Sequence, residues 1–469
     1  MCSEQHVDVV VIGARIAGAS LATHLARQGR SVLLLDREGF PSDTLSTHLI
    51  QVSGVRSMQR LGVLEELRAT EAPYLERLRP VYDGIDLTTD VAVDDGWPLG
   101  GMSINRDQLD HILISAAKRA GAQVRLRAKV EALVRAQDGR VCGVRVTSEG
   151  TTWTVRSHLV VGADGRRSKV ASTVGARTYN VTRNERFVYW GDYENVRPES
   201  PPTAYHIRTG GDLLIACWSD RGRFTVMVVP GLEDYPRFRS DPEHHFRQAV
   251  ASCEPLRPLL ESANRVERLT GTAHFPGYFR ESAGPGWVLL GDAGQFKDPA
   301  IGQGISDALR QSEELARRLR AADLTNPGHL DRTTRRWWRW RDRDGSAMYW
   351  LAAEMSQAGP MDPLLREVLS CVSEDARVRQ KFIDGVLSHR VSPYEVLTPR
   401  LIARASSRLR RKGLATTPEV LRLVARRLQV EAQHLGLRLR PRYAPLPTPA
   451  DRPRATTSDA TAYLQGVAS

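Results

Sequence analysis

Three glycine-containing turns, spread between residues 13 and 304, constrain the fold of this chain more than any other feature. Each turn separates an apolar run from a run with helical spacing. They are Gly13-Ala-Arg-Ile-Ala-Gly18, Ala163-Asp164-Gly165, and Gly291-Asp292-Ala293, the last followed by Gly302-Gln303-Gly304. A tight strand-to-helix turn directs backbone N–H groups and the positive end of a helix dipole at one point. The turns therefore predict an α/β domain that holds a large anionic ligand.

The first turn lies inside a βαβ pattern. Residues 7–12 predict a buried strand, residues 17–28 a helix, and residues 31–35 a second strand. Asp36 follows, about 20 positions beyond the glycines, where a dinucleotide-binding unit has an acid that binds a ribose hydroxyl. We predict Asp36 as that ligand. Arg37 either packs along an adenine ring or is an ordinary surface arginine.

This first turn departs from the usual glycine fingerprint. Gly13 and Gly18 supply the tight turn and the close helix–strand contact, with Ile16 and Ala17 between them. Arg15 stands where the fingerprint has the glycine that lets the backbone approach a pyrophosphate. Its side chain must turn aside, and we predict that its guanidinium binds a phosphate or a neighbouring carboxylate.

The third turn points to a flavin. Asp292 ends an apolar run, and a carboxylate there needs a hydrogen-bond partner, which a ribityl hydroxyl supplies. Pro299 and the Gly302-Gln303-Gly304 turn, continued by Ile305, start a helix whose N–H groups can stabilise negative charge on the N1–C2=O edge of a reduced flavin. Together with the other two turns, this pattern indicates FAD.

Charge and cysteine content narrow the classes of function. The net charge of +12 comes almost entirely from arginine, since only six of the 66 basic residues are lysines, and no nucleic-acid recognition motif accompanies it. Five cysteines without a CxxC pair predict neither a disulfide framework nor a zinc site, which fits a reducing cytoplasm. No run approaches the ~20 apolar residues of a membrane span. We predict a cytoplasmic protein with no bound metal, no nucleic-acid partner and no membrane span.

The period of the apolar pattern changes along the chain. From residue 178, period-2 runs separated by Gly and Pro predict an inserted antiparallel sheet. The predicted fold is α/β: a Rossmann-like FAD-binding domain, an inserted antiparallel β-sheet substrate domain and a C-terminal helical region. The predicted boundaries are 1–177 for the first part of the FAD-binding domain, with a substrate-domain contribution around 75–100, 178–276 for the sheet, 277–325 for the closing part, 326–440 for the helices and 441–469 for a disordered tail.

In order and spacing, the three turns resemble those of the FAD-dependent monooxygenases of the para-hydroxybenzoate hydroxylase type, called group A, over residues 5–320. The resemblance implies that NADPH or NADH reduces FAD and that O2 adds at C4a. The flavin C4a-hydroperoxide then hydroxylates an aromatic or polyketide-like small molecule, or oxidises a ketone in Baeyer–Villiger fashion. It also implies that Asp164 and Gly165 touch both FAD and the path of the nicotinamide cofactor, whose binding is transient.

Three further residues take roles from the same resemblance. Asn105-Arg-Asp-Gln-Leu109 is similar to the family's arginine segment, so Arg106 is expected to contact the FAD pyrophosphate region. Val130 matches the strand residue whose backbone meets adenine. Thr44-Leu-Ser-Thr-His48 is similar to a stretch beside the isoalloxazine in tetracycline-inactivating members, which makes His48 the predicted catalytic histidine.

Two positions depart from the family pattern. The family commonly has paired prolines in the loop after the third turn, whereas this chain has the charged pair Lys297-Asp298, and Ser306 stands where Asn is common. These changes predict a more polar loop beside the flavin. The variant resembles an actinobacterial subgroup associated with specialised metabolism, which implies antibiotic biosynthesis.

Aromatic residues of the predicted sheet form either a wall over the flavin or an ordinary sheet core. Neighbours on a strand point to opposite faces, so at most one of the first two can face the site. The four residues are Tyr189, Trp190, Tyr205 and Trp218.

Three other functions stay open on the sequence alone. A flavin-dependent halogenase needs a lysine in the first third of the chain and a WxWxIP segment, but no lysine precedes Lys118, and Trp338-Arg-Trp340 lacks the rest of that segment. A reductase or dehydrogenase of a prenyl or polyketide substrate uses the same FAD motifs, and so does a non-catalytic flavoprotein. The sequence also leaves open the oligomeric state and whether a separate flavin reductase supplies electrons.

Overall fold

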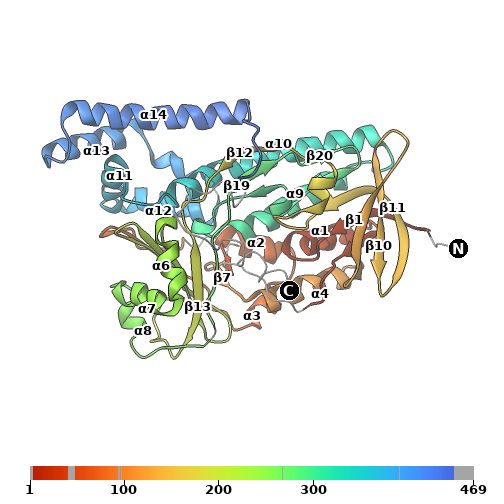
Figure 1. Cartoon of the computed structure of the whole chain (residues 1–469), viewed down its shortest axis with the longest axis horizontal. Helices are drawn as coiled ribbons and strands as arrows, with labels where there is room; N and C mark the ends of the chain where they lie inside the picture. The colour runs from red at the N-terminus through yellow and green to blue at the C-terminus, as the bar shows by residue number, and fades with distance from the viewer. Residues whose placement is uncertain are drawn as a thin grey trace.

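The computed structural model describes residues 4–40, 48–92, 96, 98–266, 268–389 and 391–447. Two large sheets dominate the fold, and helices of the C-terminal third lie along one edge of the molecule (Figure 1). The predicted α/β class with a Rossmann-like FAD-binding domain is confirmed.

The first sheet brings the three turns together. Its strand order is β20-β21-β11-β1-β2-β8, and all neighbours from β21 to β8 are parallel. The bounds are β1 Glu4–Ile12, β2 Val32–Leu35, β8 Gln123–Arg125, β9 Lys129–Arg135, β10 Val141–Ser148, β11 Thr151–Gly162, β20 Ala283–Gly284 and β21 Trp287–Leu289. The turns follow β1, β11 and β21, which are adjacent strands, so all three meet at one carboxyl edge, where ligands of α/β sheets bind.

Helices α1 (Ile16–Arg27), α4 (Arg106–Arg119) and α9 (Gly304–Arg320) share one core with this sheet. Val9 and Val11 of β1 are fully buried there beside Leu21 of α1 and Leu315 of α9. The continuous apolar run in β1 is explained by this burial, since a parallel strand covered on both faces has no polar side. The shorter elements nearby are β3 Leu49–Ile50, α2 Val52–Arg60, α3 Leu64–Arg68, β7 Met102–Ser103 and α5 Lys169–Thr173.

The second sheet is the predicted inserted sheet with a further contribution from residues 77–90. Its order is β17-β13-β16-β15-β14-β4-β5, with β18 beside β13 and β6 beside β4. The bounds are β4 Arg77–Tyr82, β5 Ile85–Asp86, β6 Thr89–Asp90, β13 Val188–Glu194, β14 Thr203–Thr209, β15 Asp212–Trp218, β16 Phe224–Val229, β17 Asn264–Arg265 and β18 Thr270–Thr272. One face packs on α6 (Tyr235–Ser240), α7 (Pro242–Ser252) and α8 (Arg257–Leu260) through Phe238 and Phe246. The other face packs against Ala300, in the loop after the third turn.

Five helices follow the two sheets in the described part of the chain. They are α10 Pro327–Met355, α11 Pro363–Ser373, α12 Ala376–Leu387, α13 Pro399–Arg411 and α14 Thr417–Leu439. Buried Arg186 fastens the end of α10 to the second sheet, because it donates to the carbonyl oxygens of Ser356 at 2.9 Å, Gln357 at 2.7 Å and Val229 at 2.9 Å. Among the described helices, none has the length and apolar content that a bilayer span requires.

The tail predicted as disordered from residue 441 is ordered at its start, so the prediction is wrong there. Asn180 donates its N–H to the carbonyl oxygen of Arg442 at 2.8 Å, and Ala444 donates to Thr178 at 3.1 Å. The ring of Tyr443 lies 4.2 Å below the guanidinium of Arg177. The segment is held because it adds to β12 (Thr178–Thr182), a pairing partner that is distant in sequence. Residues 448–469 lie outside the described residues.

Candidate functional site

The first two turns lie against each other. Gly13 has a backbone φ of 104°, and its N–H donates to the carbonyl oxygen of Leu35 at 2.7 Å. A Cβ atom on Gly13 would lie 2.3 Å from the carbonyl oxygen of Ala163, and one on Gly18 would lie 1.8 Å from that of Gly13. A side chain at either position would push β1, α1 and β11 apart, so only glycine allows this close approach.

Asp36 lies at the end of β2 on the same edge. Its carboxylate accepts the N–H of Ala14 at 2.7 Å and that of Glu38 at 2.9 Å, while burial raises its pKa against these contacts. Each carboxylate oxygen keeps a further lone pair for a hydroxyl donor. Arg37 is exposed and pairs with Glu38 at 3.0 Å, as an ordinary surface arginine does.

A buried acid that the sequence did not single out joins two of the predicted residues. Asp110 of α4 accepts two hydrogen bonds from Nη2 of Arg106, at 2.9 and 3.0 Å, and one from Nη1 of Arg15, at 3.3 Å. Of the two partners predicted for Arg15, the structure shows the carboxylate. The i,i+4 spacing of Arg106 and Asp110 is the only signal of this group in the sequence.

The second turn also caps a helix. Oδ2 of Asp164 accepts the N–H groups of Lys169 at 2.7 Å and Val170 at 3.2 Å, at the start of α5. Its other oxygen, Oδ1, is buried and has no hydrogen-bond partner among the described residues. Gly165, with a φ of 75°, leaves open space beside it. A buried carboxylate oxygen without a partner is costly, which favours a donor from a ligand at this place.

Asp292 lies in the turn that follows β21. Burial raises the pKa of its carboxyl group, and the charges of Arg166 and Arg106 oppose that rise. Its backbone carbonyl accepts the hydroxyl of Tyr278 at 2.7 Å, which fixes the turn. Arg106 therefore acts electrostatically on Asp292 while it binds Asp110, and this links the first and third turns.

The charged pair after the third turn is folded inward. Lys297 is buried and forms an ion pair with Asp307 of α9. Asp298 accepts the N–H of Ala300 at 2.9 Å and caps the short helix η3, Pro299–Ile301. Both charged side chains are therefore buried inside the protein, and the polarity of this loop beside the flavin stays a prediction.

Asp298 makes the stability of the fold depend on pH. Burial raises its pKa from 3.8 to about 6. Since the folded pKa lies above the unfolded value, the contribution to stability is complete below the unfolded pKa and is lost as the pH rises through the folded pKa. In the wild type, the free energy of unfolding should fall by about 2–3 kcal/mol as the pH rises through this range. Asp298→Asn keeps an acceptor for the N–H of Ala300 but has no titrating carboxyl group, so we expect this fall to disappear. Urea unfolding of both proteins on either side of this pH range measures the change; an unaltered pH profile would contradict the prediction.

The remaining predicted residues lie around this edge. Ile16 and Ala17 begin α1, and Ile305 lies in the first turn of α9. Val130 lies in β9. It follows Ala128 by two residues, and the N–H of Ala128 donates to the carbonyl oxygen of Asp36 at 2.8 Å. Gln303 donates its side-chain amide to the carbonyl oxygen of Val386, so that side chain points to α12 and away from the turns. The backbone at Gly302 is left-handed, and nothing crowds Gly304.

An apolar pocket lies between the second sheet and the loop after the third turn. Its lining includes residues 300–302 together with Leu78, Tyr82, Ile215, Met355, Phe382 and Val386. Residues 300–302 lead directly into α9. The pocket and the helix start predicted to face the flavin therefore share one loop.

His206 of β14 supplies a hydrogen-bonding group to this apolar lining. Its Nε2 lies 2.7 Å from the carbonyl oxygen of Ala300, and because a carbonyl only accepts, Nε2 carries the proton. Burial lowers the pKa of His206 to about 4, so the ring is neutral and Nδ1 is an acceptor. Nδ1 is buried and has no partner among the described residues. Strand alternation beside Tyr205 was the only sequence signal for this position.

His48 is placed differently. Its backbone φ is 58°, and its carbonyl oxygen accepts the N–H of Ile104 at 3.2 Å. It is not among the residues that line the pocket, although its neighbour Leu49 is. Residues 44–47 of the predicted flavin-side stretch lie outside the described residues. The structure thus brings His206 to the pocket, whereas the role of His48 stays a prediction.

The aromatic residues of the second sheet divide between its faces. Tyr189 and Tyr205 belong to the core shared with α6 and α7, and Tyr205 and Trp218 both bond to Glu199, at 2.6 and 3.1 Å. Trp190 packs on the opposite face, in the cluster that contains Ala300. One of the four aromatics therefore faces the loop after the third turn, and Tyr189 and Tyr205 are sheet-core residues.

Comparison with known proteins agrees with a flavin site at this edge of the sheet. A family model described as an FAD binding domain covers residues 6–331. The chain is 30% identical over 348 residues to the ubiquinone hydroxylase UbiL of Rhodospirillum rubrum, across 68% of this chain and 74% of that protein. It is 25% identical over 353 residues to digeranylgeranylglycerophospholipid reductase 1 of Methanococcoides burtonii, across 70% and 79%. The structure of the flavin-dependent brominase Bmp2 matches with a TM-score of 0.68 at 18% identity, over 87% of this chain and 100% of that one, which shows likeness of fold alone.

The matched region contains all three turns, Asp110 with its partners Arg106 and Arg15, and residues 300–302, which line the pocket. The relatives carry out oxidation in one case and reduction in the other, according to their names. The chain belongs to the FAD binding domain family and is an FAD-dependent oxidoreductase.

Proposed function

We propose that the protein is an FAD-dependent monooxygenase that hydroxylates, or oxidises in Baeyer–Villiger fashion, an apolar aromatic or polyketide-like small molecule. The observation that carries the proposal is the apolar pocket whose wall includes residues 300–302, directly before α9. A substrate there lies beside the turn that is predicted to face the flavin ring. The 30% identity to a protein named as a ubiquinone hydroxylase supports oxygen transfer.

The residues at the three turns fit FAD. Asp36 is suited to bind a ribose hydroxyl, and Arg106 and Arg15 are suited to bind the pyrophosphate. Asp292 is suited to bind the ribityl chain. Oδ1 of Asp164 can accept a hydrogen bond from the ligand. Bound FAD supplies the redox chemistry with O2, for which the protein provides position and electrostatics. In the balanced reaction, one oxygen atom enters the substrate, the other leaves as water, and NADPH or NADH supplies two electrons.

The pocket also suggests how a substrate is oriented. Most of its lining is apolar, and Nδ1 of His206 is a buried acceptor without a partner in the described chain, so we assign it to a substrate hydroxyl or N–H group. Gln51 and Tyr82 also line the pocket and have side-chain oxygens that can accept. Tyr82 stands edge-on to the His206 ring at 5.4 Å and limits its rotation. A planar ring that carries one hydrogen-bond donor fits this combination better than a plain hydrocarbon does.

His206→Leu tests this orientation, since it removes the acceptor and keeps an apolar side chain. We expect it to weaken binding of a naphthol by about tenfold and to leave binding of naphthalene unchanged, because one hydrogen bond contributes about 0.5–1.5 kcal/mol. Titration of the flavin absorbance of the holoenzyme measures both affinities. His244→Ala, which changes an exposed histidine of α7, is the matched control, and it should change neither. Equal losses for the two ligands would assign His206 to packing.

An FAD-dependent reductase of a prenyl or polyketide substrate is the second candidate, favoured by the relative named as a digeranylgeranylglycerophospholipid reductase. The two functions differ in their need for O2. NAD(P)H oxidation should therefore yield product only in air, and added bromide should change nothing. Anaerobic formation of a reduced product would establish the reductase instead. Cytoplasmic location and a place in antibiotic biosynthesis stay predictions of the sequence.

A further inference from the structure

The last described helix, α14, presents a line of leucines to solvent. Three leucines within the helix are spaced seven residues apart and therefore lie on one face, a fourth extends the line by one turn at the C-terminal end, and a fifth precedes the helix. They are Leu414, just before the helix, and Leu421, Leu428, Leu435 and Leu439, each between 57% and 77% exposed. Elsewhere in the described chain, the exposed large hydrophobic residues are only Leu99, Val266 and Tyr443. A contiguous apolar line of this kind marks an interaction surface, whereas single exposed residues do not.

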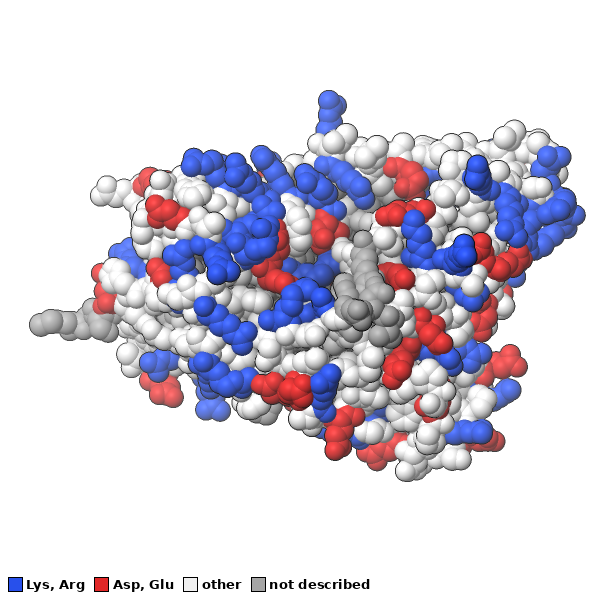
Figure 2. All heavy atoms as spheres, turned by 180° about the vertical axis from the view of Figure 1, so that it is seen from behind, with Lys and Arg blue, Asp and Glu red and all other residues white. Residues whose placement is uncertain are grey.

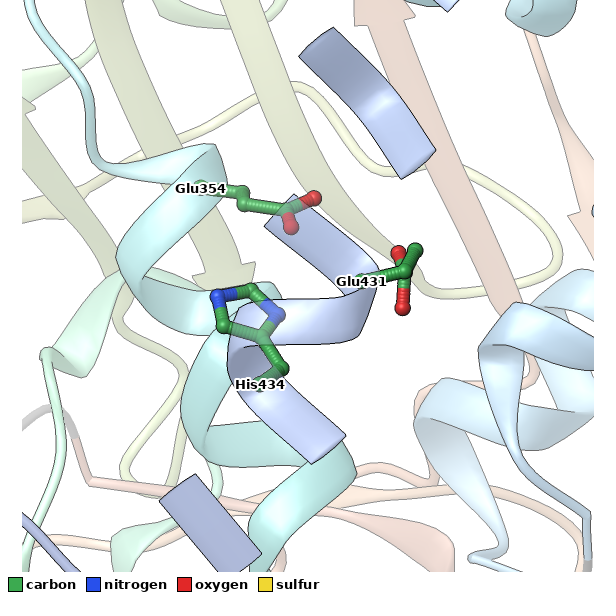
Figure 3. A group of neighbouring side chains, drawn as sticks. All are labelled: Glu354, Glu431 and His434. Atoms are coloured by element: carbon green, nitrogen blue, oxygen red, sulfur yellow. The ribbon is translucent and has the colours of Figure 1, made fainter. Parts of the chain in front are cut away.

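A neighbouring face of α14, about 100° around the helix from the leucines, is anchored to the protein, which keeps this line exposed. Figure 3 shows Glu431 and His434 of α14 beside Glu354 of α10. Arg427 pairs with Glu354 at 3.0 Å and also with Glu431, and His434 stacks on Trp350 at 4.1 Å between ring centres. Burial, followed by the charge of Arg427, lowers the pKa of His434 to about 4. Arg427 thus bonds to a carboxylate on each helix, and this group fastens α14 to α10.

Positive charge borders the leucine line. Arg422, Arg426 and Arg440 are exposed beside it, and no carboxylate of the described chain lies within ion-pair distance of them. Of the two acids of α14, Glu431 pairs with Arg427, while Glu419 bonds to Thr416 and has its pKa lowered mainly by these bonds and also by the charge of Arg422. Figure 2 turns this helix to the upper right, where a largely uncharged ridge ends in a cluster of basic side chains. An apolar line edged by unpaired arginines complements an anionic lipid surface.

We propose that α14 docks the protein onto the surface of an anionic phospholipid bilayer. The leucines enter the boundary between headgroups and acyl chains, and the arginines lie against lipid phosphates. Charge favours this occupant over a second copy of the chain, because pairing two such helices would bring together three arginines from each copy, with Glu419 beside Arg422 as their one acidic neighbour on α14. The docking is peripheral, in keeping with the absence of a spanning helix in the described residues.

Flotation of the full-length holoenzyme with vesicles tests the proposal. We expect it to float with vesicles that contain phosphatidylglycerol and not with vesicles of phosphatidylcholine alone, and added salt should weaken the binding. The triple variant Leu421→Ser, Leu428→Ser, Leu435→Ser should lower the bound fraction by about tenfold or more. Arg422→Gln with Arg426→Gln should remove the preference for phosphatidylglycerol. Leu99→Ser, which changes an exposed leucine outside the line, should bind like the wild type.

Flavin content and circular dichroism establish that each variant is folded. Equal flotation of the wild type and the triple variant, or no flotation of the folded wild type, would overturn the proposal. Analytical ultracentrifugation tests the alternative occupant, a second copy of the chain, by measuring the oligomeric state. A dimer that the triple variant dissociates, without vesicle binding by the wild type, would assign this face to a second copy of the chain and equally overturn it.

Discussion

Asp110→Ala should lower the free energy of unfolding by about 3–5 kcal/mol, because it removes the carboxylate that the buried Arg106 and the half-buried Arg15 share. Asp110 is fully buried and accepts from both Arg106 and Arg15, which come from different elements of the FAD-binding domain. Urea unfolding followed by circular dichroism measures the loss. The FAD content should fall as well, since the two arginines are no longer held at the edge of the sheet.

Asp107→Ala, one turn earlier on the same helix, is the matched control. Asp107 pairs at 2.6 Å with Arg221, whose side chain is 45% exposed, and an exposed pair contributes at most about 1 kcal/mol. A loss as small for Asp110→Ala as for this control would contradict the structural role given to Asp110.

Asp292→Ala is expected to weaken FAD binding by about ten- to a hundredfold. The proposed bond from a ribityl hydroxyl to this buried carboxylate is a hydrogen bond to a charged group, which contributes about 1.5–3 kcal/mol. Absorbance of the protein after gel filtration gives the retained flavin, and titration of the apoprotein gives the affinity. Asp323→Ala, which changes an exposed acid, should retain the wild-type affinity. Full flavin occupancy in Asp292→Ala would remove this residue from the site.

The turns at the sheet edge could be predicted because their signals are local. Gly13 and Gly18 are needed by the backbone itself, as a Cβ atom at either position would collide with a carbonyl oxygen. Asp36 follows at the distance that a βαβ unit fixes. The inserted sheet is equally visible, since each of its strands has period-2 alternation. These features depend on neighbours within about 30 residues along the chain.

The features of the site that the sequence did not predict depend on contacts between segments that are distant along the chain. Arg15 and Asp110 are 95 positions apart, so the sequence could not identify Asp110 as the carboxylate that Arg15 contacts. His206 could be identified only from the structure, which shows that its side chain lies on the face of β14 that contacts Ala300. The ion pair of Lys297 with Asp307 could not be predicted, because Asp307 lies on the following helix and its orientation depends on the fold. Alternation alone does not tell which face of a sheet adjoins a ligand.

Labelling with ¹⁸O2 tests the central claim most directly. The holoenzyme, NADPH and a naphthol are incubated under the labelled gas, and the product is analysed by mass spectrometry. The account predicts a product heavier by one labelled oxygen atom, formed by the wild type and lost together with FAD in Asp292→Ala. Label that arrives from H2¹⁸O instead, or a product that carries added hydrogen and no oxygen, would contradict the claim that this FAD-dependent enzyme is a monooxygenase.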